Sequence, residues 1–243
     1  MPELLITGAT GYLGGEVAKQ AGWHGERVEV LDAEAVDAAV SGCAAVIHTA
    51  YRKHDARVNA EGSENVARAA ARHGARLVHV STDLVFSGAP GRPLREDDPV
   101  HPIDDYGRGK AEAERRVAAA CPGAVLVRTS LIYGGAEPSD HERFAHDPGA
   151  TFFADEIRCP VAVTDLAAAL LELAGLPEVR GPLHVAGADA LSRLEFARLV
   201  TGREDLRSAP RPAGRPGDLT LDCSRARALL RTPLRGAREL LGA

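Results

Sequence analysis

Short apolar runs alternate with alanine-rich stretches of helical periodicity along the first two thirds of the chain. The apolar runs predict buried strands, and the longer stretches between them predict helices. We expect strands at residues 3–7, 27–31, 45–49, 76–81 and 124–129. We expect helices at residues 14–21, 33–41, 58–73 and 105–120, with Gly74 closing the third. This alternation is typical of an α/β fold with a doubly wound parallel sheet between two layers of helices.

After residue 135 the alternation is looser. Ser192 is followed three residues later by Glu195, a capping box that predicts a helix ending near Gly202. The remaining pattern predicts helices at 141–146 and 165–174, a short apolar segment at 152–153, a strand at 182–186, irregular chain at 208–217 and two short helices after 221. We expect one folding unit: a main domain of residues 1–134, to which 160–186 return, and a small lobe of residues 135–159 and 187–243.

Composition and charge exclude several classes of protein. The chain has 243 residues, a formal net charge of −5 and no long apolar run, so we expect neither a membrane span nor a nucleic-acid partner. No basic leader precedes the first apolar run, which predicts a soluble, cytoplasmic protein. The cysteines are scattered without a C-x-x-C pair, which predicts buried or incidental thiols rather than disulfides or a metal site: Cys43, Cys121, Cys159 and Cys223.

A glycine-rich loop, TGATGYLG from Thr7 to Gly14, follows the first predicted strand and opens the first predicted helix. This is the context that a phosphate-binding loop requires. Small residues let the backbone approach a pyrophosphate, and the free N–H groups and dipole at the helix start stabilise its charge. Taken alone, the motif fits an ordinary tight turn between a strand and a helix about as well.

Tyr106 and Lys110 are four residues apart at the start of a predicted helix, so their side chains share one face. A nearby ammonium would lower the tyrosine pKa from about 10 and suit it to general acid or base chemistry. Thr82 and Asp83 follow a predicted strand, where side chains reach the carboxyl edge of the sheet. A surface Tyr and Lys and a polar strand end are the alternatives. The order of the three motifs favours one hydride-transfer site.

Several segments resemble the extended short-chain dehydrogenases/reductases, in particular the family of dTDP-4-dehydrorhamnose reductase and its sugar-nucleotide-binding relatives. They are ITGATGYLGG, HTAY from His48, VNAEGSENVARAA from Val58, VHVSTDLVFSG from Val78, YGRGKAEAE from Tyr106, VRTSLIYG from Val127 and RPGDLTLDCSRARALL near the C-terminus. The resemblance covers nearly the whole chain. It implies a Rossmann dinucleotide-binding domain, NADPH or NADH as cofactor, and a small-molecule substrate such as a keto-sugar nucleotide or secondary metabolite. It is also compatible with a homodimer.

The resemblance also implies roles for individual residues. Tyr106 would be the proton donor, Lys110 would bind the nicotinamide ribose and tune Tyr106, and Thr82 would orient the carbonyl with support from Asp83. The cofactor would contact Gly8, Gly11, Tyr12, Leu13, Gly14, Ala50, Tyr51, Lys110 and Thr129. Candidates for a substrate phosphate are Arg143, Arg158 and Arg215, for which a solvated charge on a loop is the alternative.

The region between the glycine loop and the strand at 45–49 departs from the family pattern. It has room for one strand where such proteins usually have two, and is shorter by roughly ten residues or more. If Asp32 ends the second strand, it would bind the adenosine ribose and favour NADH. If residues 31–36, LDAEAV, are instead the remnant of the third strand, the residue that usually binds the adenosine ribose is missing. As a further alternative, Asp32 caps the helix that begins at Ala33.

This departure keeps two other functions open beside an NAD(P)H-dependent reductase. One is a noncatalytic ligand-binding or regulatory relative, and the other is a sugar-nucleotide epimerase or dehydratase. The intact set of Thr82, Tyr106 and Lys110 favours the reductase.

Overall fold

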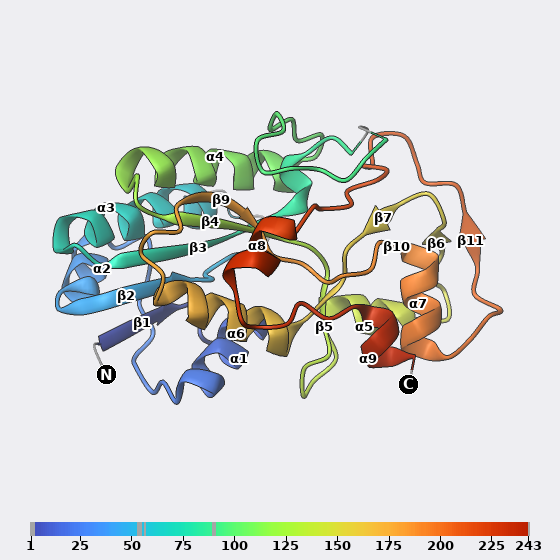
Figure 1. Cartoon of the computed structure of the whole chain (residues 1–243), viewed down its shortest axis with the longest axis horizontal. Helices are drawn as coiled ribbons and strands as arrows, with labels where there is room; N and C mark the ends of the chain where they lie inside the picture. Colours follow the sequence, from blue (N-terminus) through green and yellow to red (C-terminus); the bar gives the residue numbers. More distant parts are fainter. Residues whose placement is uncertain (1–2, 53–54, 56, 89–90, 243) are drawn as a thin grey trace.

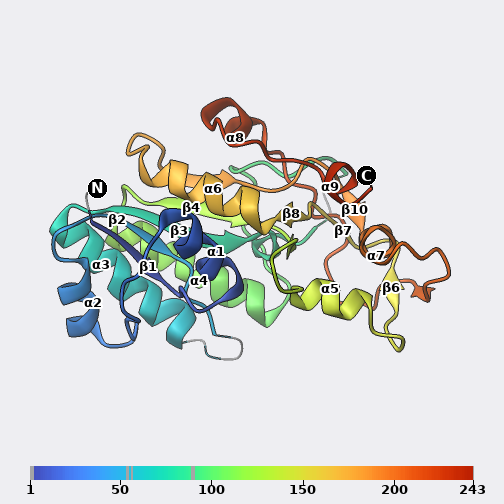
Figure 2. The same cartoon turned by 90° about the horizontal axis from the view of Figure 1, so that it is seen from below.

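The computed structural model describes residues 3–52, 55, 57–88 and 91–242. Its centre is a five-stranded parallel sheet in the order β1-β2-β3-β4-β9. These strands are β1 (Glu3–Thr7), β2 (Cys43–His48), β3 (Arg76–Thr82), β4 (Val125–Thr129) and β9 (Gly181–His184). Helices cover both faces, with α2, α3 and α4 on one and α1 and α6 on the other (Figures 1 and 2). The predicted doubly wound α/β fold is confirmed.

The helices over the sheet start and end close to their predicted positions. They are α1 (Tyr12–Ala21), α2 (Ala33–Val40), α3 (Ser63–His73), α4 (Asp105–Ala120) and α6 (Val163–Ala174). The third predicted helix opens with a π-helical turn, η1 (Val58–Gly62), before α3. Gly74 ends α3 with a φ of +67°, a left-handed conformation that glycine adopts without steric cost.

The strand predicted at 27–31 is wrong, because residues 23–31 form no regular structure. Of these residues only Val30 is buried, so the segment has little apolar surface with which to hold a strand against the sheet. Side chains anchor it instead: Trp23 Nε1 donates to Leu4 O at 2.7 Å, and Asn65 Nδ2 donates to Val30 O at 3.0 Å. Within the described residues, β1 is therefore an edge strand.

Most of the later elements gather beyond the carboxyl ends of the central strands, whereas α8 (Ser224–Leu229) packs beside β9 (Figure 1). A capping box of Ser139 and Glu142 opens α5 (Asp140–Ala145), and the predicted box of Ser192 and Glu195 opens α7 (Arg193–Thr201). The other elements are short: η2 (Asp83–Val85), β5 (Ile132–Tyr133), β6 (Phe152–Phe153), β7 (Ile157–Arg158), β8 (Val161–Ala162), β10 (Leu191–Ser192), β11 (Ser208–Ala209), α8 (Ser224–Leu229) and α9 (Ala237–Leu241). The predicted irregular run at 208–217 thus begins with β11, which pairs with β6. The division into a main domain and a lobe stays a prediction.

Apolar side chains form a cluster on each face of the sheet, and two smaller clusters lie among the later elements. All four cysteines are buried, as the sequence predicts. In the part of the chain that the structure describes, no helix is long and apolar enough to cross a membrane. Within the same residues, no group of three or more His, Cys, Asp or Glu side chains is arranged to hold a metal ion.

Candidate active site

The glycine loop packs closely against the end of β2. Gly8 has a φ of +78°, and a Cβ there would lie 2.6 Å from Ala50 N. A Cβ on Gly14 would lie 2.2 Å from Gly8 O. Gly11 N donates to Gly8 O at 2.9 Å and so closes the turn into α1. Glycine at these positions lets the loop backbone form one wall of an open cleft.

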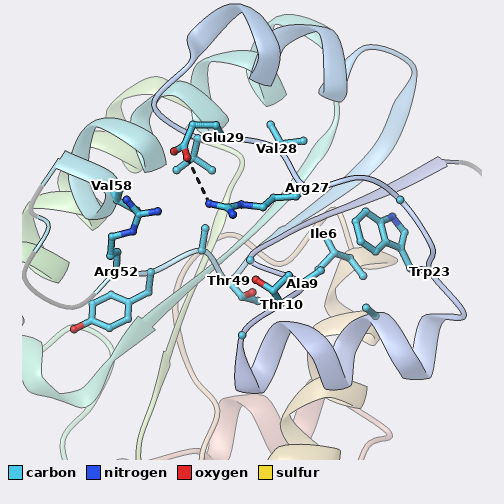
Figure 3. Close-up of a pocket in the computed structure, with 17 residues that line it drawn as sticks. Ile6, Ala9, Thr10, Trp23, Arg27, Val28, Glu29, Thr49, Arg52 and Val58 are labelled. Atoms are coloured by element: carbon cyan, nitrogen blue, oxygen red, sulfur yellow. Dashed lines mark ion pairs between the residues drawn. The ribbon is translucent and has the colours of Figure 1, made fainter.

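A cavity of about 510 Å³ opens on this loop beside β1 (Figure 3). Its walls come from the glycine loop, from the segment after α1 and from the loop after β2: Ile6, Gly8, Ala9, Thr10, Gly11, Ala18, Trp23, Gly25, Arg27, Val28, Glu29, Val30, Thr49, Ala50, Tyr51, Arg52 and Val58. The expected cofactor residues Gly8, Gly11, Ala50 and Tyr51 are among them. The volume and the glycine wall fit a dinucleotide.

Three other expected cofactor residues do not line this cavity: Tyr12, Leu13 and Thr129. The hydroxyl of Tyr12 accepts a hydrogen bond from Gly135 N at 2.7 Å, and the Leu13 side chain is buried in the core. Only their backbone amides, at the start of α1, can therefore serve a phosphate. Thr129 ends β4, and its buried Oγ1 has no hydrogen-bond partner within the described residues. A buried hydroxyl without a partner is uncommon, so Thr129 Oγ1 is a candidate ligand contact.

Asp32 lies away from the cavity, at the N-terminus of α2. Its Oδ1 accepts hydrogen bonds from Glu34 N at 3.1 Å and Ala35 N at 3.0 Å. It is not one of the residues that line the cavity. The structure thus has the helix cap that was the alternative to ribose binding, and Glu29 is the carboxylate that faces the cavity instead.

Tyr106 and Thr82 meet because α4 begins very close to the end of β3. A Cβ on Gly107 would lie 2.1 Å from Leu84 O, so glycine permits this approach. Asp104 caps α4 by accepting from Gly107 N at 2.6 Å. Tyr51, a wall of the cavity, packs edge-on against the Tyr106 ring with centroids 5.2 Å apart. The tyrosine and the threonine therefore lie at the end of the cleft.

Asp83 is buried and contacts residues of β3, β7 and the turn after β4. Thr82 Oγ1 donates to its Oδ1 at 3.2 Å, and Ser130 Oγ donates to its Oδ2 at 2.6 Å. Arg158 Nη1, from β7, lies 3.3 Å from Oδ1. The carboxylate thus fixes the hydroxyl of Thr82, as a supporting residue would.

The pKa of Tyr106 is raised above its ordinary value, chiefly by burial and further by Tyr51, Asp83 and Asp104, against a hydrogen bond with Thr82 that lowers it. The sequence-based expectation was a pKa lowered by Lys110, and it is wrong for this structure. Tyr106 is 36% exposed overall, so the burial acts on its hydroxyl end. At neutral pH the phenol keeps its proton and is ready to donate it.

The Lys110 side chain points into the sheet, where its Nζ donates to Val80 O at 2.6 Å. Burial lowers the pKa of Lys110 to about 8, and Glu114 acts in the opposite direction. His48 and His79 lie on the neighbouring strands with their rings stacked 5.3 Å apart, and burial lowers the pKa of each. Tyr106 and Lys110 share a helix face, but the turn between them directs the lysine toward β3.

A buried ion pair fixes α4 against the sheet. Arg128 on β4 binds Glu114 with Nη2 at 2.8 Å and Nε at 3.1 Å, and both side chains are buried. Ser81 Oγ also donates to Glu114. This network holds the helix that carries Tyr106 at a fixed distance from the strand that carries Thr82.

A cluster of arginines lies beyond Asp83. Glu156 accepts from Arg215 Nε at 2.7 Å and lies 3.3 Å from Arg158 Nη2. Burial lowers the pKa of Arg193 to about 10, and the nearby carboxylates of Glu156 and Asp83 act in the opposite direction. Arg193 Nη1 lies 3.4 Å from His141 Nδ1. Arg158 Nε and Nη1 are buried without hydrogen bonds to the described residues. Arg158 Nη1 is ion-paired with Asp83, so Nε is the Arg158 atom that has no partner among the described residues and can donate to a bound anion.

Two of the three predicted phosphate candidates, Arg158 and Arg215, belong to this cluster. Arg143 does not: it lies on the surface, paired with Asp140 at 2.6 Å. Sequence reasoning missed Glu156 and Arg193. They come from chain segments that only the fold brings together, and neither has a neighbour in the sequence that marks it.

A parallel sheet with a glycine loop, a strand-end threonine and a tyrosine and lysine on one helix defines a nucleotide-binding protein of the short-chain dehydrogenase/reductase class. The chain belongs to the RmlD substrate binding domain family, whose model matches residues 2–243. It is 36% identical over 273 residues to dTDP-4-dehydrorhamnose reductase of Mycolicibacterium smegmatis, covering 98% of this chain and 83% of that protein. Because 273 aligned positions exceed the 243 residues of this chain, parts of that reductase have no counterpart here.

The chain is also similar to proteins that are not named as reductases. Methionine adenosyltransferase 2 subunit beta of Xenopus laevis is 32% identical over 290 residues, covering 98% of this chain and 86% of that protein. Among solved structures, dTDP-4-dehydrorhamnose reductase of Bacillus anthracis in complex with NADP is similar in fold, with a TM-score of 0.84. That similarity covers 100% of this chain and 98% of the other at 23% identity.

Proposed function

We propose that this chain is an NAD(P)H-dependent reductase that transfers a hydride to a keto group of a sugar nucleotide, with a 4-keto-deoxysugar nucleotide as the favoured substrate. The single observation that carries the proposal is the meeting of Tyr106, Thr82 and Asp83 at the end of a cleft that begins at the glycine loop. The family relationship to dTDP-4-dehydrorhamnose reductase supports the choice of substrate.

Bound NADPH or NADH would supply the hydride. The backbone of Gly8 to Gly11 and the first amides of α1 would hold its pyrophosphate, and the unpaired Thr129 Oγ1 is a candidate contact near the nicotinamide. The ketone oxygen would lie between Tyr106 and Thr82. Tyr106 would transfer its phenolic proton to that oxygen as the carbon is reduced, and Thr82 would hold the oxygen by turning its hydroxyl hydrogen to it from Asp83.

The arginine cluster next to Asp83 supports an anionic substrate. Arg158 Nε has no partner among the described residues. Arg158 Nη1 is ion-paired with Asp83 Oδ1, which also accepts the hydroxyl hydrogen of Thr82. A diphosphate on Arg158, Arg193 and Arg215 would therefore place an attached sugar next to the proton donor.

Replacing Tyr106 with Phe tests the proposal. Turnover of dTDP-4-dehydrorhamnose with NADPH should fall by about 10²- to 10⁴-fold, because proton transfer to the alkoxide is lost. Cofactor binding, measured by calorimetry, should stay within a few-fold of the wild type. Tyr133→Phe is the matched control, since its buried hydroxyl makes no hydrogen bond within the described residues and lies outside the proposed site. Unchanged turnover in Tyr106→Phe would contradict the proposal.

A noncatalytic dinucleotide-binding protein is the second candidate. It is favoured by the position of Lys110, whose Nζ donates to Val80 O and does not lower the Tyr106 pKa, and by the relationship to a transferase subunit. It predicts nucleotide binding without reduction of any keto-sugar nucleotide, in the wild type as in Tyr106→Phe. A cytoplasmic location and a homodimer stay predictions from the sequence, and size-exclusion chromatography with light scattering would test the latter.

A further inference from the structure

Two arginines face each other across the cavity beside β1. Arg27 comes from the segment that replaces the predicted strand, and Arg52 comes from the loop after β2. Figure 3 shows their guanidinium groups pointing toward one another, with Glu29 beside Arg27. The two side chains are 68% and 53% exposed, so both are accessible to a ligand in the cavity.

Neither guanidinium group makes a hydrogen bond to the described residues. Arg27 Nη2 lies 3.7 Å from Glu29 Oε2, and Arg52 Nη1 lies 3.8 Å from Asp55 Oδ2. Both distances exceed the length of a hydrogen bond. Asp55 also accepts from the backbone amides that follow it, Arg57 N at 3.1 Å and Val58 N at 3.2 Å. The N–H groups of the two arginines are therefore available, and their mutual repulsion favours an anion between them.

The backbone on each side of the cavity is nevertheless fixed. The Asn59 side chain makes two hydrogen bonds to the backbone of Arg52: its Oδ1 accepts from Arg52 N at 3.1 Å, and its Nδ2 donates to Arg52 O at 3.0 Å. The segment of Arg27 is anchored at both ends by the hydrogen bonds of Trp23 to β1 and of Asn65 to Val30. Fixed backbones with free guanidinium groups form a prepared anion site at a small cost in entropy.

We propose that Arg27 and Arg52 bind the 2′-phosphate of NADPH and that the chain therefore prefers NADPH to NADH. The inference rests on the proposed function, which places a dinucleotide in this cavity. With the pyrophosphate on Gly8 to Gly11, the adenosine would lie on the β1 side of the cavity, which Ile6 and Trp23 line together with both arginines. Asp32, the carboxylate expected to repel a 2′-phosphate, is engaged at the N-terminus of α2.

Calorimetric titration with two nucleotides isolates the 2′-phosphate. Adenosine 2′,5′-bisphosphate and adenosine 5′-monophosphate differ only in that group, and neither contains a nicotinamide. The wild type should bind the bisphosphate at least about 10-fold more tightly, and Arg27→Gln or Arg52→Gln should each remove about 10-fold of its affinity. Binding of the monophosphate should change less than 2-fold. Arg57→Gln is the matched control, since Arg57 pairs with Glu61 and does not line the cavity.

The same variants should lower the affinity for NADPH much more than the affinity for NADH. Added salt should weaken the binding of the bisphosphate more than the binding of the monophosphate. Equal binding of the two nucleotides by the wild type, or a double variant that still prefers the bisphosphate, would overturn the inference. A wild type that prefers NADH, and that loses this preference in Glu29→Gln, would also overturn the inference. That result would show that Glu29 binds the hydroxyls of the adenosine ribose. A chain that selects the bisphosphate but reduces no ketone supports the inference and contradicts only the proposed function.

Discussion

The proposed catalytic end of the cleft, at Tyr106 and Thr82, and its β1 end, at Arg27 and Arg52, belong to one sheet but are stabilised in different ways. At the catalytic end, buried charges bind each other at short distances: Arg128 with Glu114 at 2.8 Å and Arg158 with Asp83 at 3.3 Å. At the β1 end, the pairs of Arg27 and Arg52 are exposed and span 3.7 and 3.8 Å. Buried pairs fix geometry, whereas exposed ones give way to a ligand at little cost.

This difference follows from the number of strands around each place. β3 and β4 have a neighbour on both sides, so their ends are covered by α4 and by the later elements. In the part of the chain that the structure describes, β1 has a neighbour on one side only, and a segment without regular structure lies along its free edge. Changes at the catalytic end should therefore alter folding and function together, and changes at the β1 end should alter ligand choice with little effect on folding.

The largest effect on folding is expected from Glu114→Gln. The change leaves Arg128 charged, buried and without its ion-pair partner, which costs about 3–5 kcal/mol of unfolding free energy. Chemical denaturation measures this directly. Adding Arg128→Met should recover much of the loss, because the unpaired charge is removed.

Glu112→Gln is the matched control on the same helix. Glu112 forms exposed pairs with Arg115 and Arg116, so the change should affect unfolding far less. If the two glutamate variants were destabilised equally, the catalytic end would not depend on its buried pair, and the comparison between the two ends would fail.

Lys110→Met should have a smaller effect of opposite sign. The folded-state pKa of Lys110, about 8, lies below its ordinary value of 10.5, so the unfolded chain binds this proton more tightly. Below pH 8 the buried lysine thus costs the fold about 3 kcal/mol, and stability rises as pH increases from 8 to 10.5. The groups that face the lysine are His48 and His79, which burial keeps uncharged, and Glu114.

Urea unfolding at pH 7 and pH 10 measures this effect. Lys110→Met should be more stable than the wild type at pH 7, and the difference should shrink at pH 10. Cofactor affinity should decrease in the variant if the lysine binds the nicotinamide ribose, as the family resemblance implies. A variant that is less stable than the wild type at pH 7 would show that the hydrogen bond to Val80 O outweighs the burial of the charge.

Periodicity in the sequence predicted most of the sheet and its helices, because buried parallel strands and amphipathic helices differ clearly in their apolar pattern. The alternation of Val28 and Val30 with charged residues also suggested a strand, but an edge position with one buried side chain did not hold it in the sheet. Helical spacing placed Tyr106 and Lys110 on one face without showing that the lysine turns toward Val80.

The arginine cluster was only partly predictable. Arg158 and Arg215 were candidates because of the family resemblance, but Glu156 and Arg193 meet them through contacts between β7, α7 and the loop at 211–217. Such contacts depend on the packing of distant segments, for which the local sequence contains no signal. The same is true of Arg27 and Arg52, which lie on opposite sides of one cavity.

Asp32→Ala should have the smallest effect. Its carboxylate caps α2, so its loss leaves Glu34 N and Ala35 N without their acceptor and should cost about 1 kcal/mol. The ratio of NADPH to NADH affinity should stay as in the wild type, because the side chain does not line the cavity. Thermal melts with and without each cofactor measure both quantities, and Asp32→Asn, which keeps a capping oxygen, should restore most of the stability. A selective loss of NADH affinity in Asp32→Ala would show that Asp32 binds the adenosine ribose. The β1 end would then recognise its ligand through a carboxylate rather than through two arginines.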